Sequence, residues 1–412
     1  MIAEADRTTG TIQSFLNIVK ANLRNFSMFL VLGIIMVGFA FLTHGVNLNP
    51  RNFTYIFIQN SYILILAVGM LLVIVVGNID LSVGSLSGFM GSVAVIIFNQ
   101  TGMGLLPTAA LTILIGLLVG AYQGYWIAFV KIPAFIVTLA GMLLFRGLNY
   151  IITRVTPVTP RTDAFKEMAS GTIDVLKTKA AWAVGAFRPA QGEVHLLPLI
   201  IGALIVLYIV VMSISDRRSK IKNDFQTLPM SYFLIKLVAI SAIILLLSVQ
   251  FARYRGLPTI VAVLGVTAVI FTFITKNTIF GRYIFAVGGN QRSAKLSGIN
   301  SERVVFAVHV IMGGLCALAG MAFAGYMNSA LPDAGKDFEL EAIAACFIGG
   351  ASTTGGIGTI IGAIMGGLVM GTINNHMSIM NIGTNWQYVV KALVLLLAVW
   401  YDLFARKKAG VA

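Results

Sequence analysis

Long apolar runs recur along nearly the whole chain and constrain its fold more than any other feature. The 412 residues are 58% hydrophobic and only 11% charged, a far more apolar composition than that of soluble globular proteins. A helix needs about 20 mainly apolar residues to cross the hydrocarbon core of a membrane. Because the runs are continuous rather than alternating, they predict an all-α, polytopic helical membrane protein rather than a β-barrel.

The runs predict ten spans and one shorter, interrupted pair. The ten spans are Asn25–Leu42, Tyr55–Val76, Leu81–Phe98, Leu105–Val130, Ile132–Ile152, Leu196–Ser213, Tyr232–Phe251, Pro258–Thr275, Val304–Ala324 and Tyr388–Phe404. Before the last span, the run Ala342–Gly350 is too short to cross a membrane, whereas Gly356–Ile373 is long enough. We therefore expect a broken or re-entrant hairpin there, and about ten to twelve membrane segments in all.

The distribution of Lys and Arg predicts the orientation of the chain. With the N-terminus inside, about sixteen basic residues fall on the cytoplasmic side and about ten outside, as the positive-inside rule requires. Both termini are then cytoplasmic. The predicted organisation is an amphipathic helix over 1–24, a single transmembrane domain over 25–404 and a tail over 405–412, with an outer segment at 153–195, a basic cytoplasmic loop at 214–231 and a second cytoplasmic region at 276–303.

The net charge of +14 does not indicate nucleic-acid binding, because the basic residues lie between the apolar runs and form no basic domain. The chain contains no G-x-x-x-x-G-K-S/T sequence for a nucleotide phosphate, and its four histidines are scattered singly. Cys316 and Cys346 both lie inside apolar runs. We therefore expect no cofactor, no metal site and no enzymatic activity in this chain, and membrane lipid around it.

Glycines repeat every four residues in two of the apolar runs. They are Gly116, Gly120 and Gly124 in the first run, and Gly358, Gly362 and Gly366 in the second. Such spacing lets helix backbones approach closely in lipid. We expect tight packing within one subunit or at a dimer contact, and the alternative is a flexible helix that forms a gate.

The polar stretch "GNIDLSVG", residues 77–84, lies between two strongly apolar runs. Its polar side chains are those of Asn78, Asp80 and Ser82. Asp80 stands at the start of the third span, where an N-cap carboxylate accepts backbone N–H bonds and complements the helix dipole. We expect Asp80 to be either a structural cap beside an inner gate or a residue that acts directly in gating.

The stretch "TIFGRYIFAVGGNQRSAKLSGIN", residues 278–300, is the longest inner connection and resembles a docking device. Gly288 and Gly289 permit a sharp turn, after which a capped helix of about two turns is predicted. Its residues are Asn290 as the cap, then Gln291, Arg292, Ser293, Ala294, Lys295, Leu296 and Ser297, and Gly298 in the left-handed conformation. Arg292 and Lys295 are spaced i, i+3, and Ala294 and Leu296 offer apolar contacts to a partner. The alternative is a solvated basic loop that only fixes topology.

Five stretches follow one another in a fixed order along nearly the whole chain. They are "GNIDLSVGSLSGFMG", "IPAFIVTLAGMLLFRGL", "GRYIFAVGGNQRSAKLSGI", "ELEAIAACFIGGASTTGGIG" and "WQYVVKALVLLLAV". Together they resemble the permease subunits of bacterial ABC importers for monosaccharides. The likeness is greatest to the xylose and multiple-monosaccharide permeases, which carry an extra hydrophobic pair in mid-chain. Here this pair is the two segments that flank "SDRRSKIKNDFQ".

The resemblance implies an inner-membrane protein that works with three kinds of partner. These are a second permease copy in a homodimer, a cytoplasmic ATPase that binds ATP and Mg²⁺, and a periplasmic sugar-binding protein. It also implies that Asn290–Gly298 is the coupling helix that enters a cleft on the ATPase. The sequence departs from the family at Gln291 and Arg292, where an acid is frequent, at Gln123 in place of asparagine and at Glu341 in place of aspartate.

A neutral sugar needs small hydroxyl and amide partners and an aromatic wall along its pathway. Candidate pathway residues of these kinds are Asn60, Ser61, Gln123, Tyr125 and Trp126. The sequence thus predicts an ATP-driven monosaccharide importer permease. The alternatives are a permease for branched-chain amino acids or nucleosides, and a proton-coupled carrier, which we would expect to keep acids inside its spans.

Arg146 is a further pathway candidate, because an arginine inside an apolar span costs several kcal/mol unless it is paired or hydrated. We expect it in the outer half of the membrane, near Glu339 and Glu341. Asp80 is expected toward the cytoplasm, roughly 20 Å away in depth, so we expect no salt bridge between Asp80 and Arg146.

Overall fold

The computed structural model describes residues 31–173, 176–179, 193–223, 225 and 229–408. The predicted amphipathic helix over 1–24 and the end of the tail lie outside the described residues. Eight helices in the described part are long and apolar enough to cross a membrane. They are α2 (Pro50–Val75), α3 (Val83–Thr101), α4 (Leu105–Ala128), α5 (Ala134–Thr153), α7 (Leu196–Lys222), α8 (Met230–Ala252), α9 (Thr259–Asn277) and α12 (Ser301–Met327). They coincide with eight of the ten predicted spans, which confirms the polytopic all-α fold.

The remaining elements are shorter or connect the long helices. The helical ones are Val31–Leu42, η1 (Val46–Leu48), α6 (Ala164–Ser170), α10 (Ile279–Gly289), α11 (Gln291–Leu296), α13 (Phe338–Ile348), α14 (Ile360–Ile379) and α15 (Thr384–Lys408). Four short strands form two antiparallel pairs, β1 (Thr172–Ile173) with β4 (Leu257–Pro258) and β2 (Lys177–Lys179) with β3 (Glu193–His195). Sheet structure therefore plays only a connecting role in the described part of the chain.

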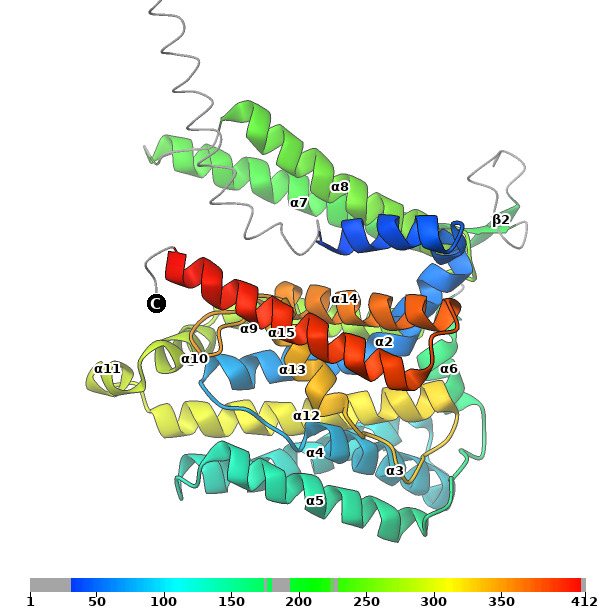
Figure 1. Ribbon diagram of the computed structural model, residues 1–412, viewed down its shortest axis with the longest axis vertical. Helices are drawn as coiled ribbons and strands as arrows, with labels where there is room; N and C mark the ends of the chain where they lie inside the picture. The colour runs from blue at the N-terminus through cyan, green and yellow to red at the C-terminus, as the bar shows by residue number, and fades with distance from the viewer. Residues whose placement is uncertain (1–30, 174–175, 180–192, 224, 226–228, 409–412) are drawn as a thin grey trace, which may run out of the picture.

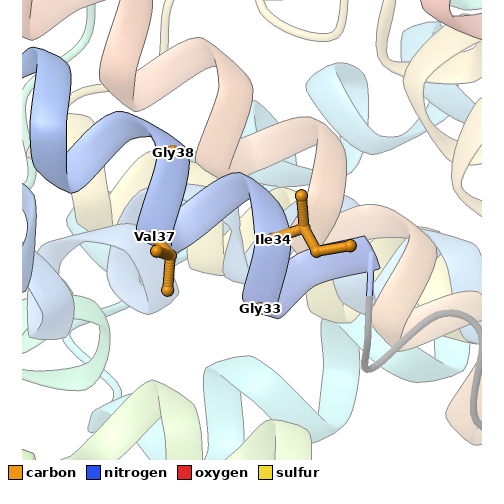
Figure 2. Close-up of a pocket in the computed structure, with 4 residues that line it drawn as sticks. All are labelled: Gly33, Ile34, Val37 and Gly38. Atoms are coloured by element: carbon orange, nitrogen blue, oxygen red, sulfur yellow. The ribbon is translucent and has the colours of Figure 1, made fainter.

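The helix Val31–Leu42 is the described part of the predicted first span. A hollow on its surface is lined by Gly33, Ile34, Val37 and Gly38 (Figure 2). All four residues are apolar, so this hollow provides no side-chain hydrogen bond for a polar molecule.

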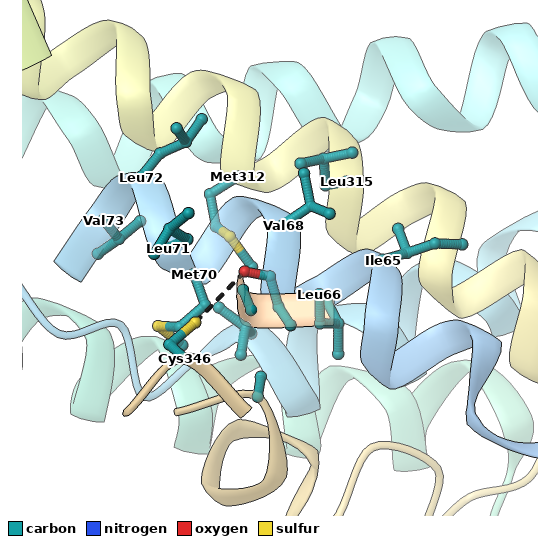
Figure 3. Close-up of a cluster of buried hydrophobic side chains, with 14 of the residues drawn as sticks. Ile65, Leu66, Val68, Met70, Leu71, Leu72, Val73, Met312, Leu315 and Cys346 are labelled. Atoms are coloured by element: carbon teal, nitrogen blue, oxygen red, sulfur yellow. Dashed lines mark hydrogen bonds between the residues drawn. The ribbon is translucent and has the colours of Figure 1, made fainter. Parts of the chain in front are cut away.

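Helix α2 is the centre of the bundle and is buried over nearly all of its length (Figure 1). On one side, Ile65, Val68 and Leu72 lie toward α12, from which Met312 and Leu315 reach into the same cluster (Figure 3). On another side, the thiol of Cys346 in α13 donates a hydrogen bond to the carbonyl oxygen of Ala67, at 3.4 Å. A helix that is apolar all round is expected to be buried, and α2 fits that rule.

Close glycine contacts join the helices around α2. A methyl group at Gly116, Gly120 or Gly124 of α4 would press on the backbone or side chains of α12, and one at Gly313 of α12 would overlap the carbonyl oxygen of Gly116. In the same way Gly362 and Gly366 of α14 lie against the backbone of Gly349 and Ala345. The predicted glycine repeats are thus confirmed as packing surfaces within one subunit.

Helices α7 and α8 form the predicted extra pair and stand apart from the other helices (Figure 1). Most of their surface is exposed. They pack on each other at Gly202 and Ser248, and Phe251 contacts Phe53 and Phe57 of α2. Helix α7 extends to Lys222, so the first part of the predicted loop 214–231 is helical. An i, i+4 ion pair of Lys220 with Asp216, at 2.6 Å, supports this extension beyond the apolar run.

The predicted broken hairpin is present. Helix α13 has only 11 residues, about 16 Å of helix, which is too short to cross a membrane, whereas α14 has 20 residues. Two segments without helix accompany it, residues 328–337 before α13 and residues 349–359 before α14. A similar break, residues 76–82, separates α2 from α3.

Candidate functional site

The start of α3 and the break before α13 meet inside the bundle. A methyl group at Gly84 would overlap the carbonyl oxygen of Gly335 and a carboxylate oxygen of Glu339, and one at Gly88 would overlap the carbonyl oxygen of Ala334. The first turns of two helices therefore lie against each other. Irregular backbone within a membrane bundle is tolerated only where protein or a water-filled cavity surrounds it, so such breaks mark functional regions.

Asp80 organises the first of these breaks. Its Oδ1 accepts hydrogen bonds from the Ser82 backbone N–H, at 2.9 Å, and from the Ser82 hydroxyl, at 2.6 Å. Both residues are buried. The N-cap residue of α3 is Ser82, so the prediction that Asp80 is itself the N-cap is wrong. Asp80 instead closes an Asx-type turn onto the residue two positions ahead, and this turn delivers the chain to the helix start.

Gln123 of α4 joins Asp80 and Ser82 in one buried network. Its Nε2 donates to the Ser82 hydroxyl at 2.9 Å. Gly141 of α5 makes room for this contact, because a methyl group there would overlap Gln123 Nε2 and lie 3.2 Å from the Ser82 Cβ. Asn78, the other polar residue of the stretch, is half-buried, and its backbone N–H donates to the carbonyl oxygen of Val73 at 3.0 Å.

The other predicted pathway residues do not join this network. Asn60 and Ser61 are buried in α2, where their side chains donate to the carbonyl oxygens of Ile56 and Ile58. Tyr125 and Trp126 are exposed on the outward side of α4. Positions i and i+2 of a helix point in different directions, so Tyr125 cannot share a face with Gln123. These residues therefore share no single surface within the described chain, and their contact with the sugar stays a prediction.

Tyr125 and Trp126 belong to an exposed aromatic group at one end of α4. Tyr125 contacts Trp126 and Phe129, with ring centroids 5.7 and 6.0 Å apart, and Phe129 contacts Phe306 of α12. Aromatic rings gather at the boundary between membrane and water. This group is typical of such an interface belt.

Arg146 lies on α5, five residues beyond Gly141, so its depth differs from that of the Asp80 network by only about 8 Å. The predicted difference of roughly 20 Å is too large, because the start of α3 lies beside Gly141 of α5, only five residues from Arg146. The charge of Arg146 acts on the carboxyl group of Glu339 and on the hydroxyl of Tyr150. Glu339 is buried, and its Oε2 has no hydrogen-bond partner among the described residues. No ion pair joins Arg146 to Glu339 among the described residues, so the positive charge of Arg146 acts on this buried carboxyl group only at longer range.

The acidic segment 331–341 is held from two sides by polar contacts that the sequence does not reveal. On α5, Asn149 donates to the carbonyl oxygens of Leu331 and Pro332, and the hydroxyl of Tyr150 donates to Asp333 at 2.5 Å. On α15, Tyr388 donates to Asp337 at 3.3 Å, and Lys391 donates to Glu341 at 2.6 Å. The sequence predicts Glu341 near Arg146, but Glu341 pairs with Lys391. The sequence does carry one signal for this pair. Lys391 is a lysine inside the apolar run 386–400, just as Arg146 is an arginine inside an apolar span.

The Glu341–Lys391 ion pair predicts that the stability losses of substitutions at its two residues are not additive. The two side chains are 21% and 20% exposed, so removal of one partner leaves a half-buried charge without its counter-ion. We expect Lys391→Met and Glu341→Gln each to lower the thermal midpoint of the detergent-purified protein, and the double variant to lower it less than the two single shifts combined. The coupling should be about 1 kcal/mol, since solvent reaches the pair.

The exposed pair Asp216–Lys220 is the matched control for this cycle, because its side chains are 63% and 52% exposed. Its coupling should be close to zero. Equal coupling in the two pairs would contradict the structural importance assigned to Glu341 and Lys391.

Helix α11 has the predicted local geometry. The side chain of Asn290 accepts the backbone N–H of Ser293 at 2.9 Å, and Gly298 closes the helix with φ +83°. The helix projects from one end of the bundle (Figure 1), and Leu296 at its tip is 85% exposed. Arg292 is also exposed. A basic and an apolar side chain are therefore displayed together on a rigid projection.

Two residues of α11 differ from the prediction. Ala294 is buried, so its side chain faces the protein and not a partner. Lys295 forms an ion pair with Glu302 of α12, and Glu302 is also 4.0 Å from Lys131. This ion pair fixes α11 to the start of α12, so Lys295 holds the helix in place as well as adding charge.

In the part of the chain that the structure describes, no group of three or more His, Cys, Asp or Glu side chains is arranged to hold a metal ion. The described residues supply a buried polar network beside the start of α3 and a projecting helix, α11. A buried polar network beside a break between helices is typical of membrane transport proteins.

Comparison with known proteins identifies the family of the chain and several similar proteins. Residues 52–399 match the family described as "Branched-chain amino acid transport system / permease component". The chain is 38% identical to the xylose transport system permease protein XylH of Haemophilus influenzae over 395 residues, 94% of this chain and 98% of that protein. It is 38% identical to XylH of Escherichia coli K12 over 408 residues, 99% of this chain and 98% of that protein. It is 32% identical to the ribose import permease protein RbsC of Escherichia coli K12 over 360 residues, 86% of this chain and 88% of that protein. No solved structure matches the chain significantly.

Proposed function

The chain belongs to the family described as "Branched-chain amino acid transport system / permease component", and from this premise we propose that it imports xylose. It is the membrane permease subunit of a monosaccharide ABC importer and a multi-pass protein of the inner membrane. The observation that carries the choice of sugar is the similarity to the XylH proteins over 94% and 99% of this chain. The similarity to RbsC extends over less of the chain. A permease for branched-chain amino acids or nucleosides, and a proton-coupled carrier, are not favoured, since these relatives are named for xylose and ribose.

The proposal includes the working assembly. Two copies of the chain form the pathway in the lipid bilayer, with both termini in the cytoplasm. A separate cytoplasmic ATPase binds ATP and Mg²⁺ and receives α11, and a periplasmic protein delivers the sugar. The Asp80–Ser82–Gln123 network stands at the inner part of the pathway, and Arg146 with Glu339 stands farther out. The contact of the two helix starts supports this placement, because discontinuous helices build the solute sites of many transporters.

Uptake into proteoliposomes tests the proposal. The permease is reconstituted with its ATPase and binding protein, and labelled xylose, ribose, leucine and adenosine are offered in turn with ATP inside. We expect xylose uptake that vanadate abolishes and a protonophore leaves unchanged. Uptake of leucine or adenosine in place of xylose would favour the other permeases, and loss of uptake with a protonophore at constant ATP would favour the carrier.

The docking role of α11 predicts the effect of one charge reversal. Arg292 is exposed and forms no ion pair with any other described residue, whereas Lys295 is already engaged with Glu302. We therefore expect Arg292→Glu to reduce co-purification of the ATPase and ATP-driven uptake by about tenfold, because it places the wrong sign at the interface. Leu296→Ser should act in the same direction, since it removes an exposed apolar anchor.

Arg303→Glu is the matched control for this reversal. Arg303 is exposed and its replacement makes the same change of charge nearby, but it lies on α12 and not on α11. It should leave association and uptake near the wild-type level. Equal losses for Arg292→Glu and Arg303→Glu would mean that general surface charge, and not α11, determines the association.

A further inference from the structure

Gly288 and Gly289 end helix α10 immediately before α11, and neither has a positive φ. The chain bends at Asn290, with φ −160° and ψ 101°, which other residues also adopt. The expectation that these glycines serve a sharp turn is therefore wrong. Gly288 has to be glycine for a different reason, which is the lack of space around its Cα atom.

The neighbour of Gly288 is the C-terminal end of α2. A methyl group at Gly288 would overlap the carbonyl oxygen of Val75 and lie 2.8 Å from the backbone nitrogen of Gly356. That nitrogen donates to the same Val75 oxygen at 2.9 Å. The last carbonyls of a helix have no partner within the helix, so here the break before α14 supplies one.

Three backbone segments thus meet at one point without intervening side chains. They are the end of α10, the end of α2 and the glycines 355–356 of the break before α14, which adopt φ +84° and +72°. A methyl group at Gly356 would lie 2.8 Å from the Cα of Gly289, and one at Gly355 would lie 3.3 Å from the Cα of Gly77. We name this contact of Val75, Gly288, Gly355 and Gly356 the glycine joint.

The glycine joint lies between the two parts of the candidate site. On one side, Asn290 follows directly and caps the docking helix α11. On the other side, Val76 begins the break that carries Asp80 and leads into α3. Close-packed backbone transmits displacement, because interiors of proteins have low compressibility. A shift of α10 must therefore move the end of α2 or open the joint.

We propose that the glycine joint transmits the position of α11 to the break before α3, with Gly288 as a positioning residue for transport. The proposal rests on the function proposed above, in which α11 receives the movement of the ATPase. Contact through backbone atoms makes this link stiff, since no side chain can change rotamer to absorb the shift. Val287 and Ile284 are buried beside the joint and hold α10 against the same core.

Neighbouring glycines provide the test. Gly288→Ala fills the contact with Val75, whereas Gly289→Ala places its methyl group in open space, with no heavy atom within 4 Å. Each variant is purified with the ATPase that co-purifies with the wild-type chain, and is reconstituted with the binding protein. We expect Gly288→Ala to bind the ATPase and hydrolyse ATP at the basal rate, but to lose xylose uptake about tenfold or more. Gly289→Ala should transport normally.

A spin label reports the transmitted movement directly. Ile79 is 42% exposed, and the two native cysteines are buried, so Ile79→Cys can be labelled selectively. In the wild-type and Gly289→Ala backgrounds, addition of ATP should change the mobility of the label. In Gly288→Ala this response should be lost.

Three results decide the matter. Equal uptake in Gly288→Ala and Gly289→Ala would overturn the proposal, and so would a label at Ile79 that never responds to ATP in a wild-type complex that transports sugar. The second result stands even if Gly288→Ala does not fold. If the wild-type chain binds no ATPase, the proposed function itself is wrong, and the proposal for the glycine joint, which depends on it, is wrong as well.

Discussion

Gly313→Leu is expected to abolish the folded permease, because it forces apart two helices that touch through their backbones. Gly313 lies where α12 crosses α4, and even a methyl group there would overlap the carbonyl oxygen of Gly116 and press on the backbone of Gly120. Overpacking a core by a few carbon atoms costs about 1–3 kcal/mol when side chains can move. Here the neighbour is backbone, so the two helices must separate.

The measurement is the yield and thermal midpoint of monodisperse protein after extraction in detergent. Gly265→Leu on α9 is the matched control, because no heavy atom lies within 4 Å of the position that a Cβ atom would take at Gly265. This control should retain most of the wild-type yield. A stable, monodisperse Gly313→Leu protein would show that α4 and α12 do not pack as described.

Asp80→Ala is expected to destabilise the protein and to reduce uptake strongly. The Ser82 N–H and hydroxyl would lose their common acceptor in a buried site, and each buried group left unsatisfied costs about 1–3 kcal/mol. If only about 1.4 kcal/mol of this loss enters the barrier for transport, uptake falls about tenfold. Asp80→Asn keeps one carbonyl oxygen at the same place, so it should retain most of the stability.

The pair of variants separates a structural role of Asp80 from a role in gating. Full uptake in Asp80→Asn, with loss in Asp80→Ala, is the result expected for a turn that is held by hydrogen bonds. Loss of uptake in both, with unchanged thermal midpoints, would assign the function to the negative charge. Asp216→Ala, at an exposed acid on α7, controls for the loss of any carboxylate. Wild-type stability and uptake in Asp80→Ala would contradict both roles.

The sequence predicts the elements of this fold well because membrane helices are specified locally. Eight spans, the short α13 and the caps of α11 all follow from runs of neighbouring residues, and each is confirmed. Hydrocarbon demands that each span satisfy its own backbone, so length and apolar character suffice to find it. The glycine repeats are equally local signals of close packing.

The partners of polar side chains are beyond the reach of the sequence. Lys295 pairs with Glu302 and Lys391 with Glu341, and neither spacing follows from a helix repeat in one element. Tyr125 and Gln123 are near neighbours in sequence and yet one is exposed and the other buried. The partner and the burial of each polar side chain depend on which face of its helix packs against α2 or α12. Packing between segments far apart in the sequence determines that face.

The place of Asp80 shows the same limit. Its stretch is conspicuous in the sequence because polar residues interrupt apolar runs, but nothing in those residues reveals that the break enters the bundle. Helix α3 starts against Gly335 and Glu339, which come from a segment about 250 residues later in the chain. The closeness of Asp80 to the level of Arg146 follows from a second such contact, that of Ser82 with Gly141 of α5.

The attachment of α7 and α8 has a consequence for how the protein fits its bilayer. The pair is largely exposed and contacts α2 through Phe251, near the C-terminal end of α8. It can therefore tilt about this end of α8. A membrane that thickens or thins acts on spans of fixed length and is accommodated by tilt. The pair α7 and α8 can tilt in response to such changes, so that variation in lipid composition need not alter the spacing of the other helices.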